Sequence, residues 1–263
     1  MLEIARYEAE RRLKGTVALA VGLGILSLFF IAFFPSFAEI DMDSYMEAFP
    51  PAAQEAFGIA SLDTIEGFLA VEIYNFVWLL LLGLYVAYVA AGTIAEDVER
   101  DRMDMLLSLP VSRTRVLTEK FAALFVPIGV LNVVVPIAVY AGVLAIGESV
   151  DPVDLVMVHL LSIPYLLACA AIGLVLSTVV DRADVAKRIA IAAVFVLFLI
   201  DSISASTEGL EWVGNVSPTA YYDPTAVLVE SSYDLTGAAV LLAATVALVI
   251  VSQYQFRRSD IGT

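Results

Sequence analysis

The chain has 263 residues, of which 60% are hydrophobic, and it carries a formal net charge of −15 at pH 7. Several apolar runs exceed the ~18 residues that mark a membrane-spanning helix, and these runs show no polar face at a helical period. The composition argues against a soluble fold. It predicts an all-α integral membrane protein, with one membrane domain over residues 1–263.

The chain opens with a charged segment, residues 1–14, in which Ala5, Ala9 and Leu13 share one helical stripe. This pattern is typical of an amphipathic helix in the membrane interface, and it fits a solvated helical start equally well. Six apolar runs follow, each close to the ~20 residues that cross a hydrocarbon core. The predicted spans are residues 15–38, 68–94, 121–146, 153–180, 189–206 and 235–256.

The basic residues predict the orientation of these spans. All 14 Lys and Arg lie before the first span, between the second and third, between the fourth and fifth, or after the sixth. By the positive-inside rule, both termini are predicted to be cytoplasmic. The acidic residues that outnumber the basic ones then lie on the outer side of the membrane. This fits either adaptation to very salty water, where such charge is screened, or an attractant for cations.

Residues 95–120 are polar in an otherwise apolar chain, and we call this segment the elbow. The pattern predicts a helix over 95–109 that ends at Pro110, followed by a turn in which Ser112 or Thr114 caps the third span. The predicted apolar face consists of Val98, Met105, Leu106 and Leu109. A solvated loop gains nothing from such a face, so it should be covered by membrane surface, by the chain's own loops or by another protein.

The elbow resembles the signature loop of ABC transporter permeases of the exporter class, the ABC-2 type. The matching residues are Gly92, Glu96, Asp97, Arg100, Leu106, Leu107, Ser108, Leu109, Pro110, Val111, Ser112, Arg113 and Lys120. Six spans and the outer "SPTAYYDP" at Ser217–Pro224 are similar too.

The resemblance implies that the elbow is a cytosolic coupling helix that docks in a groove on a separate ATPase subunit. That subunit would bind ATP and Mg, and two permease subunits, identical or different, would assemble with two ATPases in the plasma membrane. The predicted coupling residues are Glu96, Asp97, Arg100, Met105, Leu106, Leu107, Leu109, Pro110, Arg113 and Lys120. The apolar ones would enter the groove, and the charged ones would pair with its rim.

The sequence gives little support for a catalytic activity of this chain itself. It has no phosphate-binding G-x-x-x-x-G-K-[ST] loop, and no cofactor is predicted here. The resemblance therefore implies that the energy comes from another chain. Because His159 and Cys169 are the only residues of their types, no metal site is predicted. No nucleic-acid partner is predicted either.

The alternative is an ATP-independent six-span protein, either a scaffold or a membrane enzyme. The "AEDVER" at 95–100 has a weak similarity to the paired-glutamate motif of CAAX-processing proteases, which also need several histidines.

Polar side chains inside predicted spans suggest a translocation path, because they are costly in lipid. The candidates are Glu72, Asn75, Asn132 and Asp201. Glu72 can instead reach outer water, and Asp201 can simply end its span. The mostly apolar spans favour an amphipathic cargo.

Overall fold

The computed structural model describes residues 3–38, 62–108, 110–205, 207 and 209–258, and no strand occurs among them. Within these residues, six helical runs are long and apolar enough to cross a membrane, which confirms the predicted all-α fold and number of spans. In chain order the runs are α1 (Glu3–Ala38); α4, η2 and α5 (Ile65–Phe68, Leu69–Leu82, Gly83–Glu99); α7 and α8 (Arg113–Ala122, Phe125–Ala145); α9 (Pro152–Val179); α10 (Ala183–Ala205); and α13 (Leu235–Arg258).

The short elements lie in the connections between these runs. Helix α6 (Arg102–Leu107) connects the second span to the third. Helices α11 (Glu211–Gly214), η3 (Pro218–Tyr221) and α12 (Pro224–Glu230) lie between α10 and α13.

Helix α1 joins the predicted charged segment to the first span without a break. The segment contains good helix formers and neither Gly nor Pro before Gly15. Arg6 and Glu10 pair across one turn at 2.7 Å. The N-terminal segment is therefore the first part of the spanning helix and not a separate element.

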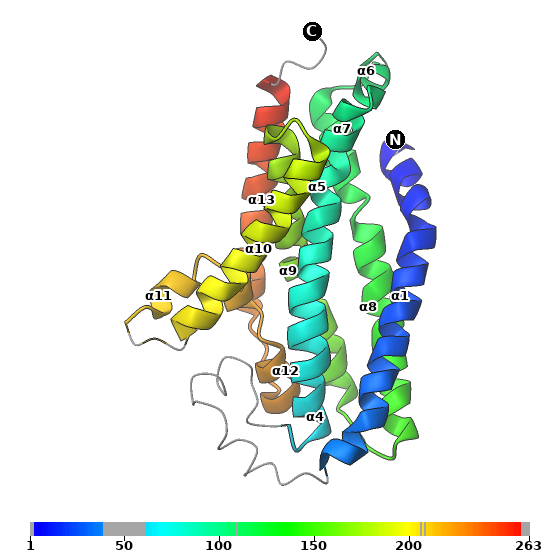
Figure 1. Ribbon diagram of the computed structural model, residues 1–263, viewed down its shortest axis with the longest axis vertical. Coiled ribbons are helices and arrows are strands. Elements are labelled where there is room, and N and C mark those ends of the chain that lie inside the picture. The colour runs from blue at the N-terminus through cyan, green and yellow to red at the C-terminus, as the bar shows by residue number, and fades with distance from the viewer. Residues whose placement is uncertain (1–2, 39–61, 109, 206, 208, 259–263) are drawn as a thin grey trace.

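The second and fourth spans form the buried centre of the bundle. Helix α9 packs along α5, α10 packs on both of these helices, α13 packs on α9, and α1 packs on α8 (Figure 1). A Cβ atom at Gly173 in α9 would lie 2.2 Å from the carbonyl oxygen of Ala87 in α5. Only glycine permits this approach, the small-residue packing that membrane helices use.

Two irregularities interrupt the central helices. Element η2 is wound as a π-helix, and the Tyr165 hydroxyl of α9 donates to the Leu79 carbonyl at 2.8 Å. The third span breaks between α7 and α8, where Pro127 cannot donate to the carbonyl of Ala123. In both places a backbone group loses its usual helical partner, and at η2 a neighbouring helix supplies the replacement.

Helix α1 begins and α13 ends at the end of the molecule where α6 and α7 lie (Figure 1). We call this the elbow end, and the end with α4 and α12 the opposite end. The four basic segments of the sequence lie at the elbow end, because each begins or ends a span there.

Candidate functional site: the elbow and its contacts

The elbow contains two helices joined by a left-handed residue. Helix α5 ends at Glu99, Asp101 adopts φ 54°, and α6 begins at Arg102. Aspartate tolerates this conformation better than most residues do, which explains why the predicted helix over 95–109 restarts after one turn. Of the two predicted caps, Ser112 and Thr114, it is Ser112 that caps α7, accepting a hydrogen bond from the Arg115 amide at 3.3 Å.

The apolar side chains of α6 face two ways. Met103 is fully buried in the core, and Leu106 and Leu107 pack partly against it. Met105 points outward and is 68% exposed. The chain itself covers part of the apolar surface and leaves Met105 uncovered, whereas Leu109 lies outside the described residues.

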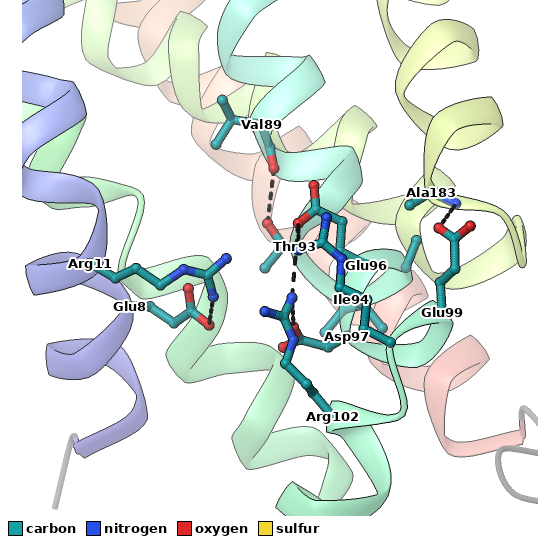
Figure 2. A network of polar contacts seen from close by, with 12 residues as sticks. Glu8, Arg11, Val89, Thr93, Ile94, Glu96, Asp97, Glu99, Arg102 and Ala183 are labelled. Atoms are coloured by element: carbon teal, nitrogen blue, oxygen red, sulfur yellow. Dashed lines mark hydrogen bonds and ion pairs between the residues drawn. The ribbon is translucent and has the colours of Figure 1, made fainter.

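Four charged side chains from four helices form an ion-pair cluster, defined as Glu8, Asp97, Arg102 and Lys120, in which all but the half-buried Arg102 are buried. The Lys120 ammonium lies 2.6 Å from Glu8 of α1 and 2.5 Å from Asp97 of α5, and its side chain is 1% exposed. Arg102 of α6 pairs with Asp97 at 2.6 Å (Figure 2). Two acids and two bases neutralise each other, which makes their burial tolerable.

The cluster places two predicted coupling residues behind the surface. Asp97 and Lys120 are buried and paired within the chain, so neither presents a charge to a partner. Glu8 was not predicted, because its contact with Lys120 joins residues 112 positions apart in the sequence. No local pattern reveals a pair at that separation.

Two further elbow carboxylates lie at the N-termini of neighbouring spans. Glu119 accepts hydrogen bonds from the amides of Ile4 and Ala5, at 3.0 and 3.3 Å, at the start of α1. Glu99 accepts from the Ala183 amide at 3.2 Å, at the start of α10 (Figure 2). Carboxylates stabilise helix N-termini by satisfying free amides and by opposing the helix dipole.

The elbow also bonds to the sides of two spans. Glu96 pairs with Lys187 of α10 and lies 4.0 Å from Arg100, its predicted neighbour one turn away. Arg113 donates to the Phe256 carbonyl of α13 at 3.2 Å. The elbow, which connects the second and third spans, is thus bonded to α1, α10 and α13 as well.

The family model of ABC-2 family transporter proteins matches residues 2–261, nearly the whole chain. The chain belongs to the ABC-2 transporter family. It is a permease subunit of an ABC transporter and a multi-pass protein of the plasma membrane. Membership implies a partnership with an ABC ATPase subunit. No curated protein matches the sequence.

Three of the four polar residues predicted for a path in this permease have separate partners. Asn75 donates to Thr225 of α12 at 3.1 Å, and Asp201 lies within hydrogen-bonding reach of Thr219 in η3. Asn132 accepts from Ser162 of α9 at 3.0 Å. Glu72 is half-buried in η2. The structure does not gather these side chains at one site.

The single histidine of the permease is buried and has polar partners on two other spans. His159 of α9 lies 2.9 Å from the Tyr74 hydroxyl and 3.3 Å from the Asn132 side-chain oxygen. Glu96, several turns away along the second span, pairs with Lys187 instead. The glutamate and the histidine that a peptidase would combine therefore have different partners. In the described part of the chain, no three His, Cys, Asp or Glu side chains are grouped as a metal site requires.

Proposed function

We propose that this permease belongs to an ATP-driven exporter, in which the elbow receives the movement of a separate ATPase and transmits it to the spans. One observation carries this proposal. The elbow joins the second and third spans, bonds to α1, α10 and α13, and still exposes Met105. A displacement of α6 would reach five of the six spans through bonded groups.

The ion-pair cluster is the rigid part of this connection. Arg102 of α6 contacts Asp97 of α5, and Lys120 of α7 links Asp97 to Glu8 of α1. Buried pairs resist separation, since an unpaired charge left in the interior is costly. Helix α6 would therefore move together with the ends of these three helices.

The exposed residues of the elbow form the proposed docking surface. Met105 supplies the apolar contact, with Leu106 and Leu107 beside it, while Arg100 is exposed at the edge and Pro110 ends the surface. Arg113 is half-buried against α13, and Asp97 and Lys120 lie behind the surface as positioning groups. An apolar centre with charges at its edge is the usual anatomy of a protein interface.

The remaining parts of the proposal rest on the family resemblance, on the placement of the basic residues and on the apolar spans. The partner ATPase binds ATP and Mg, the elbow end faces the cytoplasm, and two permease subunits complete the transporter. The apolar spans favour an amphipathic cargo. Asp201 and Glu72 remain candidates for its path, and an Asp201→Asn variant that transports normally would remove Asp201 from it.

Met105→Asp tests docking, because Met105 is exposed and the change costs the fold little. We expect co-purification with the partner ABC ATPase to fall on the order of tenfold, since a carboxylate would enter an apolar groove. Tyr7→Asp is the matched control, as Tyr7 is 65% exposed at the same end but lies on α1.

The control should leave co-purification unchanged. If Met105→Asp retains the ATPase as well as Tyr7→Asp does, α6 is not the docking element. Leu106→Asp is a weaker probe, because Leu106 also packs against the core of the permease.

A further inference from the structure

A cavity of about 220 Å³ lies between α1, the second span and the third span near the elbow end. Its floor consists of buried apolar side chains, among them Val86, Leu124 and Leu131. Its rim includes Arg11, Gly15 and Tyr85, which are exposed. The cavity is therefore open on one side and apolar inside.

The rim carries excess positive charge. Arg11 and Arg12 both line the cavity, and each lies 3.7 Å from Glu8. That carboxylate is already held by Lys120 at 2.6 Å. Three bases, Arg11, Arg12 and Lys120, thus surround the single Glu8 carboxylate, and the two arginines at the rim are only partly neutralised. Arg11 extends from α1 toward the middle of the bundle (Figure 2).

Below the arginines, the lining of the cavity is mostly apolar. Thr16, the one hydroxyl in the lining besides Tyr85, donates to the Arg12 carbonyl at 3.0 Å. From Leu124 to Leu131 the lining descends seven residues, about 10 Å of helix. Cavities with such walls do not favour water. An occupant must be apolar along this depth and anionic at the rim.

We propose that the cavity holds the headgroup-proximal part of one acyl chain of an anionic phospholipid from the elbow-end leaflet, with its phosphate beside Arg11 and Arg12. Basic pockets between membrane helices on one side of the bilayer are known lipid headgroup sites. The arginines stand where α1 changes from charged to apolar, which is the headgroup level. The lipid fills the space between α1 and the second span and touches the helix turn that carries Glu8.

Gly15 and Gly22 allow a matched test of the acyl site. A Cβ atom at either position meets nothing within 4 Å, so both accept a larger side chain, but only Gly15 lines the cavity. The permease would be purified in detergent with phosphatidylglycerol, and retained lipid would be counted by native mass spectrometry. We expect Gly15→Leu to lose most of the phosphatidylglycerol that wild type and Gly22→Leu retain. Equal retention by Gly15→Leu and Gly22→Leu would overturn the proposal.

Arg11→Gln and Lys14→Gln test the headgroup, because both remove an exposed charge from α1 and only Arg11 lines the cavity. Neither substitution disturbs the core. Wild type and Lys14→Gln should prefer phosphatidylglycerol over phosphatidylcholine severalfold, and Arg11→Gln should lose that preference. Equal retention of both lipids by wild type would refute an anionic site. Displacement of the lipid by millimolar inorganic phosphate would identify a free anion as the ligand instead.

Discussion

The two ends of the bundle hold their helices together by different chemistry. At the elbow end, buried contacts join charges of opposite sign, as between Lys120 and Asp97 at 2.5 Å. At the opposite end, Asp154 accepts hydrogen bonds from the Ser231 hydroxyl, at 2.8 Å, and from the Tyr233 hydroxyl. Asn75 and Thr225 form a neutral contact there at 3.1 Å.

This difference follows from the distribution of basic residues along the sequence. Because all 14 Lys and Arg belong to one end, acids at the other end must bond to hydroxyls, amides and helix N-termini. A buried ion pair leaves an uncompensated charge when one partner is removed, whereas a neutral bond leaves only an unsatisfied group. Equivalent deletions should therefore cost more at the elbow end.

Lys120→Met should have the largest effect. It leaves Glu8 and Asp97 buried with less neutralisation, and such deletions cost about 3–5 kcal/mol. We expect the melting temperature in detergent to fall by roughly 10 °C. Adding Asp97→Asn should restore part of the loss, because it removes one of the uncompensated charges.

Arg188→Met is the control for this variant. Arg188 pairs with Asp184 at 3.8 Å, but its side chain is 81% exposed, and exposed pairs contribute little. If Lys120→Met lowers the melting temperature no more than Arg188→Met does, the ion-pair cluster does not stabilise the fold more than an exposed pair.

Glu119→Ala should have the next largest effect, at about 2 kcal/mol, because it removes a buried acceptor of two α1 amides. The first turn of α1 should open, and hydrogen exchange at Ile4 and Ala5 should become faster. Glu10→Ala, at an exposed site on the same helix, should leave that exchange unchanged. Unchanged exchange in Glu119→Ala would mean that other contacts hold the start of α1.

The sequence predicted only part of the difference between the two ends of the bundle. The one-sided placement of Lys and Arg predicted where the charges would gather, and the long apolar runs predicted six spans. Ser112 was predicted as a cap because capping is local. The partners of Lys120 were not predicted, because Lys120 meets Asp97 and Glu8 only when α7 packs beside α5 and α1.

Exposure at the elbow was equally hard to predict. The pattern placed Met105 and Leu106 on one face, yet Met105 is exposed while Leu106 packs on the core. The left-handed turn at Asp101 rotates α6 relative to α5. Because the elbow contains several aspartates, the sequence does not indicate which of them adopts this conformation. Glu119 and Glu99 act as caps of helices distant in sequence, so they too lie beyond local patterns.

At the opposite end, Asp154→Asn should have a smaller effect on stability than either elbow variant, because the amide keeps one acceptor. The Asp154 hydrogen bond raises the pKa of Tyr233 to about 12, from an ordinary 10.0. A raised pKa means that this bond stabilises the fold below pH 10 and is lost as pH rises through about 12. In Asp154→Asn the Tyr233 pKa should return toward 10, which ultraviolet titration against Tyr233→Phe would detect. An unchanged tyrosine titration would contradict the contact.

Asn75→Ala should have the smallest effect, because it removes one neutral bond between the second span and α12. Such bonds between membrane helices average about 0.6 kcal/mol in double-mutant cycles. A cycle of Asn75→Ala with Thr225→Val should give a coupling near that value in thermal unfolding, well below that of Lys120 with Asp97. The same variants also test whether Asn75 only holds α12 in place or contacts cargo in a translocation path. If Asn75 only holds α12, Thr225→Val should alter transport as little as Asn75→Ala does. If Asn75 contacts cargo, Asn75→Ala alone should reduce transport while the coupling stays small.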